Sequence, residues 1–204
     1  PMFYDSMIAK LIVHGTDRLD AIRRMRDALD GFVIRGISSN IDFQSALLAH
    51  PDFVSGDFNT GFIAEHYPHG FSGEPSADLA ADAIHFALAG AVHRRFRERA
   101  AGIDGQLAGH EPVRIDDFVA VVTDKEGVQQ HVPVSIGEPI NGGEVDVRVS
   151  DSRPIRIRLL DPLRDIAIRA EISMQDDNAQ WGPFAPIAAR IERLGLDYLI
   201  AHQG

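Results

Sequence analysis

The spacing of hydrophobic residues changes from a helical period to a period of two about halfway along the chain. In the first half, apolar side chains recur at helical spacing, and the clearest stripe consists of Leu19, Ile22, Met25, Leu29 and Phe32. Thr16 or Asp17 can cap this helix, and Ser39 or Asn40 can cap a shorter one that runs through Leu48. Helices followed by a long run of strands predict an α+β chain.

Alternating apolar and polar residues between turn residues predict the strands. Two are expected early in the chain, at Phe3–His14 and Phe32–Ile34. Seven more are expected later, at Asp117–Thr123, Gln129–Ile136, Glu144–Ser150, Ile155–Leu160, Asp165–Ser173, Ile187–Arg193 and Tyr198–His202. Short strands joined by tight turns form an antiparallel meander, which tends to close into a β-barrel. Seven strands would leave an eight-stranded closure one strand short.

A long helix is predicted before the meander, from a cap at Ser76 to about Ala101. From Leu79 to Val92 it is apolar nearly all round, and a soluble helix of that kind is enclosed by protein. Its many Ala and Gly residues make it slim enough to fit inside a small barrel. We therefore expect the strands to wrap around this helix and to bury Leu79, Ala83, Ile84, Phe86, Ala87 and Gly90.

A break rich in Gly and Pro, His69–Pro75, divides the chain into two predicted domains. We place the first domain at residues 1–68, the linker at 69–75 and the second domain at 76–204. The second domain is expected to be truncated at its last strand. The strand-like start at Pro1 indicates a piece of a longer protein.

Composition narrows the expected partners. The 204 residues are 45% hydrophobic and 25% charged, as in soluble globular proteins. A formal net charge of −10 argues against nucleic acid and anionic membranes. No apolar run approaches the ~20 residues that a membrane span needs, and the N-terminus does not read as a signal peptide. We expect binding to neither nucleic acid nor membrane.

The sequence contains no constellation typical of catalysis. G-x-S-x-G does not occur, and the absence of Cys excludes thiolate zinc sites. His66 and His69 form H-x-x-H, but two histidines fall short of the three or four ligands of a metal site. His85 is expected to be a core histidine that hydrogen-bonds to the barrel wall. Neither a catalytic residue nor a metal ligand is assigned.

Several sequence blocks follow one another in an order found in a known family. They are Tyr4-Asp-Ser-Met-Ile-Ala-Lys-Leu11, Gly36-Ile37, Asn40-Ile41 and Asn59-Thr-Gly-Phe-Ile-Ala-Glu65. In this order they resemble the C-terminal subdomain of biotin carboxylases, over about the first third of the chain. The stretch from Thr60 to Phe71 is similar to the propionyl-CoA carboxylase branch of that family.

The resemblance implies the fold and function of the whole. In that branch the domain linking biotin carboxylase to carboxyltransferase, the BT domain, comes next. It is an antiparallel β-barrel around a long central α-helix, with a loop called the hook after the helix. The parent enzyme uses biotin, ATP and Mg²⁺: ATP and bicarbonate carboxylate biotin, and a carboxyltransferase β subunit transfers the carboxyl group to propionyl-CoA. It is expected in the bacterial cytoplasm or the mitochondrial matrix.

This chain is expected to lack activity on its own. It has no Gly-rich nucleotide loop and no Ala-Met-Lys-Met biotinylation motif, so no cofactor is expected to bind it. Its expected partners are the carboxyltransferase β subunit and the other domains of the α subunit.

The resemblance also implies site residues. Tyr4 and Asp5 match a family position near biotin and bicarbonate, although packing at the start of a strand is an alternative. Thr60, Gly61 and Phe62 match a segment that passes near adenine. The residues expected to dock a partner are Ile103, Leu107 and Val113 in the hook segment, and Trp181 in a later loop. The alternatives are a disordered connector for the first and a core plug for Trp181.

Other functions remain open at this point. The chain could belong to a related enzyme such as methylcrotonyl-CoA carboxylase. A small-ligand-binding β-barrel is an alternative of a different class, and an apolar helix that fills the barrel would argue against it. A complete enzyme of another type is the third alternative, which the lack of a nucleophile or metal constellation disfavours.

Overall fold

The structure is a computed structural model that divides the chain into two compact units. One unit is Pro1–Phe71 together with Gln203–Gly204, and the other is Ser72–His202. The structure describes residues 7–73, 79–105, 107, 109, 115–123, 127–140, 143–160, 166–195 and 197–202, and of residues 79–82 the backbone only.

The first unit is helical. Its elements are α1 (Arg18–Asp30), α2 (Ile41–Ala49), α3 (Pro51–Ser55) and α4 (Phe62–His66). Leu29, Ile41 and Phe62 are its buried apolar side chains, drawn from three different helices. The predicted capping residues stand where expected, at Asp17 before α1 and Asn40 before α2. Side-chain capping is present only at the first, where Asp17 accepts a hydrogen bond from the backbone N–H of Asp20 at 2.8 Å.

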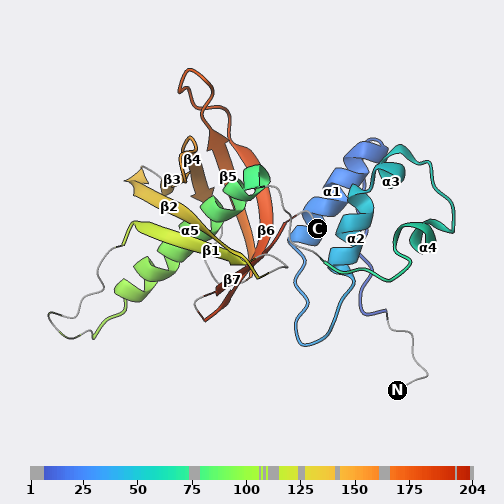
Figure 1. Cartoon of the computed structure of the whole chain (residues 1–204), viewed down its shortest axis with the longest axis horizontal. Helices are drawn as coiled ribbons and strands as arrows, with labels where there is room; N and C mark the ends of the chain where they lie inside the picture. The colour runs from blue at the N-terminus through green and yellow to red at the C-terminus, as the bar shows by residue number, and fades with distance from the viewer. Residues whose placement is uncertain are drawn as a thin grey trace. The chain divides into compact units, whose positions relative to one another are not determined.

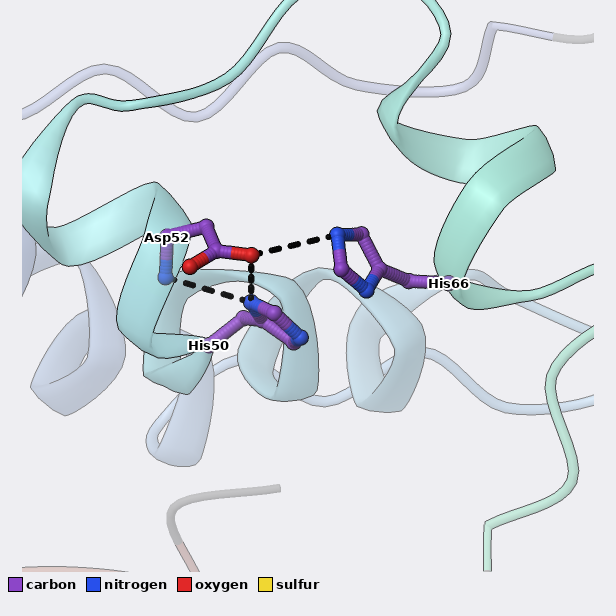
Figure 2. A group of neighbouring side chains, drawn as sticks. All are labelled: His50, Asp52 and His66. Atoms are coloured by element: carbon purple, nitrogen blue, oxygen red, sulfur yellow. Dashed lines mark hydrogen bonds and ion pairs between the residues drawn. The ribbon is translucent and has the colours of Figure 1, made fainter.

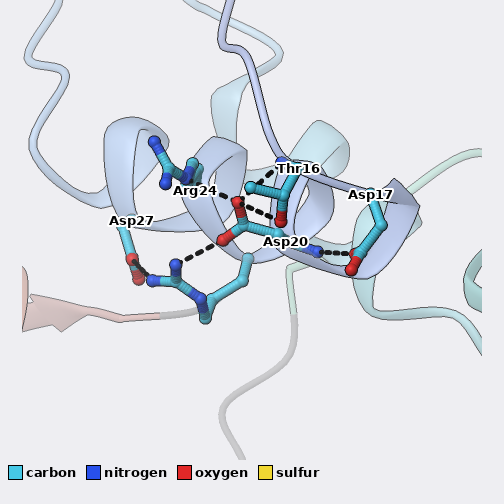
Figure 3. A network of polar contacts seen from close by, with 6 residues as sticks. Thr16, Asp17, Asp20, Arg24 and Asp27 are labelled. Carbon is cyan, nitrogen blue, oxygen red and sulfur yellow. Dashed lines mark hydrogen bonds and ion pairs between the residues drawn. The ribbon is translucent and has the colours of Figure 1, made fainter.

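Asp20 is the centre of a polar network at the start of α1 (Figure 3). Its carboxylate accepts from the backbone N–H of Thr16 at 2.9 Å and forms ion pairs with Arg23 at 2.6 Å and Arg24 at 2.9 Å. The hydrogen bond from Thr16, followed by those from the two arginines, lowers the pKa of Asp20 well below its usual value of 3.8. The charged form of Asp20 is therefore the form that the folded helix stabilises.

Asp20→Asn should destabilise the chain at pH 7, and the difference from the unsubstituted chain should shrink as the pH falls below the usual pKa of 3.8. The sign follows from the lowered pKa of the folded state: the stabilisation is complete above the unfolded pKa and is lost as the pH falls toward the folded value. Thermal unfolding followed by helical circular dichroism would measure it. Asp27→Asn is the matched control, because Asp27 forms an ion pair with Arg23 at 3.2 Å and should matter less. A deficit independent of pH would contradict this account.

The two early strands predicted from the sequence are wrong where the structure describes them. Residues 7–15 and 32–34 have no strand assignment, and Ile8 and Ile12 are exposed. A strand exists only when its backbone pairs with another, and no described segment of the first unit provides a partner. The alternation was real, but the partner that would make it a strand is not supplied.

The second unit consists of one helix and one sheet. The helix α5 spans Leu79–Ala101. The strands are β1 (Asp117–Thr123), β2 (Gln129–Ile140), β3 (Glu144–Val149), β4 (Ile155–Leu159), β5 (Ala167–Met174), β6 (Ala185–Leu194) and β7 (Asp197–Ala201). They pair antiparallel in chain order, and the sheet curls along α5 (Figure 1). Each of the seven strands predicted after residue 116 is present, with its ends shifted by a few residues at most.

The curled sheet encloses the middle of α5. No side chain from Ala83 to Arg94 is exposed, and the helix packs against β2, β3, β4 and β7. Gly90 permits close packing, because a Cβ there would lie 3.2 Å from Cγ1 of Val134. Helix and strand side chains form one core, which includes Leu88, Val92, Val147 and Ile157.

The predicted fold class, a β-barrel wrapped around a helix, is confirmed as a curled antiparallel half-barrel. The expected burial of the helix needs correction at its start. Ala87 and Gly90 are buried, but Ala83, Ile84 and Phe86 are only half-buried, and the side chain of Leu79 lies outside the described residues. The described strands pair from β1 through to β7 without a β1–β7 pair, so the curl covers the helix less completely than a closed barrel would.

Candidate functional site

The residues predicted to border a nucleotide form the turn into α4. The N–H of Gly61 donates to Oδ1 of Asn59 at 2.6 Å, and a Cβ on Gly61 would lie 2.9 Å from that oxygen, so the turn requires glycine. Thr60 is exposed, whereas Phe62 is only 5% exposed. An adenine contact would therefore depend on Thr60 and Gly61, and it stays a prediction. Three other predicted site residues lie outside the described residues: Tyr4, Asp5 and Val113.

Phe62 is instead the centre of an aromatic cluster that joins α4 to the α2–α3 junction. Its ring centroid lies 5.0 Å from that of His50 and 4.5 Å from that of His66. Phe58 and Phe53 pack against it from the other side, at 5.8 and 6.4 Å. These contacts bring two histidines together that are 16 positions apart in the sequence.

His66 lies beside different residues from those that its sequence motif indicated. The motif paired it with His69, but the structure places it beside His50 and Asp52 (Figure 2). Nε2 of His66 lies 3.2 Å from Oδ2 of Asp52, and Nδ1 of His50 lies 3.8 Å from the same oxygen. Sequence reasoning missed this cluster because only the folded chain brings His50 next to His66. The one local signal was His50-Pro-Asp52, which is typical of a helix start.

The predicted docking segment follows the end of α5. Its Ile103 is 64% exposed and its Leu107 is 74% exposed, and neither residue lies in a helix or strand. The last turns of the helix carry exposed or half-buried Arg95, Arg97 and Arg99. The enclosed helix thus ends in a basic and then apolar accessible segment.

Trp181 packs against the face of the sheet that points away from the core. The guanidinium of Arg156 lies 4.0 Å from its ring centroid, a cation–π contact. Arg156 also forms an ion pair with Asp146 at 2.7 Å, and in the same way Arg158 lies over Phe184 and pairs with Glu171. Trp181 is half-buried and does not belong to the core cluster, so the alternative of a core plug is wrong. Its role in partner binding stays a prediction.

Two histidines of α5 make polar contacts with the end of the sheet. Nε2 of His85 lies 2.9 Å from Nδ1 of His202, which follows β7, in line with the predicted hydrogen bond to the wall. Nδ1 of His93 lies 2.8 Å from the hydroxyl of Tyr198. Burial, with Arg97 and Arg193 nearby, lowers the pKa of His93, and burial raises the pKa of Tyr198. Both are therefore neutral near pH 7 and suited to a structural hydrogen bond.

Comparison with known families assigns a class to each unit. Residues 1–65 match the biotin carboxylase C-terminal domain. Residues 86–204, which include most of α5 and the whole sheet, match the propionyl-coenzyme A carboxylase BT domain. The chain therefore belongs to the propionyl-coenzyme A carboxylase BT domain family, and the resemblance predicted from the sequence is confirmed.

Individual relatives agree with both matches. The propionyl-CoA carboxylase alpha chain of Ruegeria pomeroyi is 46% identical over 112 residues, which is 54% of this chain. The mitochondrial propionyl-CoA carboxylase alpha chain of Sus scrofa is 37% identical over 133 residues, or 60% of this chain. Biotin carboxylase 1 of Bacillus subtilis is 56% identical over 63 residues, or 31% of this chain. The matches span only 16%, 18% and 14% of these relatives.

The structure offers no candidate for a bilayer-spanning segment among the helices it describes, since none is both long and apolar enough.

Proposed function

We propose that the chain is part of the α subunit of a biotin-dependent propionyl-CoA carboxylase, and that its second unit docks that subunit onto the carboxyltransferase β subunit. In the parent enzyme, ATP and bicarbonate would carboxylate biotin, and the β subunit would pass the carboxyl group to propionyl-CoA. Biotin, ATP and Mg²⁺ serve that whole enzyme, in a bacterial cytoplasm or a mitochondrial matrix. The chain alone contributes assembly and is inactive.

The observation that carries the docking proposal is the exposure of Ile103 and Leu107 directly after an enclosed helix. Exposed apolar side chains on an accessible segment are typical anchors for a protein partner. The basic end of α5 beside them can steer an acidic surface toward the segment. The alternative of a small-ligand barrel is disfavoured, because Leu88, Ala91 and Val92 fill the interior of the curl.

Replacing Ile103 and Leu107 together by Ser should abolish co-elution of the chain with a propionyl-CoA carboxylase β subunit. Loss of even one hot-spot side chain weakens binding by about 2 kcal/mol, or roughly 30-fold. Because both side chains are exposed, the free energy of unfolding should change by less than about 0.5 kcal/mol. Size-exclusion chromatography of the mixture and urea unfolding of the chain measure the two effects.

The matched control replaces Ile12 and Leu19 by Ser. These are the same residue types, also exposed, but they lie in the first unit. Co-elution should survive in the control. Binding that persists in the Ile103→Ser, Leu107→Ser variant would place the docking surface elsewhere, and loss of stability instead of binding would assign both residues to the core.

A further inference from the structure

The cluster of His50, Asp52 and His66 brings three metal-type ligand atoms together. One nitrogen from each histidine and one oxygen of the carboxylate all lie within 4.8 Å of one another (Figure 2). His50 precedes α3, Asp52 lies in its first turn, and His66 is the last residue of α4. Two histidines and a carboxylate are a donor set that zinc and other divalent transition metals accept.

The hydrogen bonding of His50 favours a cation at this position. Nδ1 of His50 accepts a hydrogen bond from the backbone N–H of Asp52 at 3.3 Å, so this nitrogen presents a lone pair and not a proton. The carboxylate oxygen of Asp52, 3.8 Å away, is also electron-rich. Two electron-rich atoms that face each other repel, and a positive ion between them reverses the sign of that interaction.

The distances suit a small ion with short bonds. Metal–ligand bonds of about 2.0–2.2 Å in tetrahedral geometry place neighbouring ligand atoms about 3.4 Å apart. The two distances to Oδ2 of Asp52 are 3.2 Å from His66 and 3.8 Å from His50, on either side of that value. Small side-chain rotations would therefore complete the geometry.

The surrounding packing holds the two rings in place before any ion arrives. The imidazole centroids of His50 and His66 are 4.2 Å apart, and buried Phe62 packs against both. The side chains remain accessible, with exposed fractions of 25% for His50, 31% for His66 and 47% for Asp52. An ion can thus enter from solvent and keep water in its remaining positions, as at open zinc sites.

We propose that His50, Asp52 and His66 form a binding site for a divalent transition-metal ion of the zinc type. This site lies in the first unit and is independent of the docking function proposed for the second unit. His50 and His66 donate nitrogen ligands, Asp52 donates an oxygen, and solvent supplies the rest. With one carboxylate and two neutral imidazoles, a divalent ion would leave the site with a net charge of +1.

The test titrates ZnCl₂ into the metal-free chain by isothermal calorimetry at pH 7.5, and repeats the titration with CoCl₂ while recording the visible absorption of cobalt. One equivalent should bind, and cobalt should show the intense bands of a four- or five-coordinate ion. His66→Gln, Asp52→Asn and His50→Asn each remove one ligand, and Asn at position 50 keeps an acceptor for the start of α3. Each should weaken zinc binding beyond the roughly 10–100-fold typical of losing an outer-shell partner.

His69→Gln is the matched control, since His69 is exposed, lies three positions from His66 and is not in the cluster. It should retain the full affinity. Circular dichroism of the metal-free variants identifies those that fold, and any one folded ligand variant decides the question. The proposal is overturned if zinc does not saturate the unsubstituted chain, if folded ligand variants bind as tightly as it does, or if His69→Gln loses as much affinity as His66→Gln.

Discussion

Leu88→Ala is expected to lower the free energy of unfolding of the second unit by about 2–5 kcal/mol. Leu88 is 1% exposed and lies on α5 at the centre of the core that the helix shares with the sheet. Truncation removes buried methyl groups and leaves a cavity that the surrounding strands can only partly fill. Since small domains are stable by only about 5–15 kcal/mol, the loss is a large fraction of the total.

Urea unfolding followed by the fluorescence of Trp181, the only Trp of the chain, would measure this loss in the unit that contains the mutation. Leu199→Ala is the matched control, because the same groups are removed from an exposed position on β7 and should cost less than about 1 kcal/mol. Equal effects of the two substitutions would mean that α5 is not the core of the sheet.

Arg94→Met should destabilise the second unit by about 2–3 kcal/mol, because it removes a buried, charged hydrogen-bond donor. The side chain of Arg94 is 8% exposed, and it pairs with Glu98 at 2.9 Å and Asp116 at 3.5 Å. It also donates to the carbonyl oxygen of Gly137. Met retains most of the apolar stem, so the change isolates the guanidinium.

The contact with Gly137 explains why this arginine matters. Ile136 pairs with Val147 and Pro139 with Val145, so Gly137 and Glu138 both lie opposite a single residue of β3, in a β-bulge. A bulge turns backbone groups out of the regular ladder, and Arg94 donates to the one at Gly137. The helix thereby stabilises the bend that lets β2 follow the curl.

Arg153→Met provides the comparison for Arg94. Arg153 pairs with Asp177 at 2.5 Å, but their side chains are 53% and 93% exposed, and such pairs contribute about 0–1 kcal/mol. The same urea unfolding experiment serves both variants. A loss for Arg94→Met no larger than that for Arg153→Met would show that solvent replaces the guanidinium at the bulge.

The predictions that the sequence supported well are those whose causes are local. Asp17 caps α1 through a hydrogen bond that spans three residues, and the strands from β1 to β7 are each bounded by turn residues that favour a reversal of the chain. Alternation along β3, β4 and β5 reflects one buried and one exposed face, which each strand carries in its own sequence. Order along the chain then equals order in the sheet, because every connection is a hairpin.

By itself, the sequence therefore determined the helix-then-meander plan, the seven strands and the family to which they belong, since periodicity, caps and turns act over a few residues. Only the tertiary structure decided the contacts between distant segments: His66 beside His50, Arg94 at the bulge of β2, and Trp181 beneath Arg156. It also decided that residues 7–15 form no strand and that the start of α5 is half-buried. The physical reason is the same in each case. Pairing, burial and ion contacts depend on which surface arrives opposite, and an isolated segment carries no record of its partner.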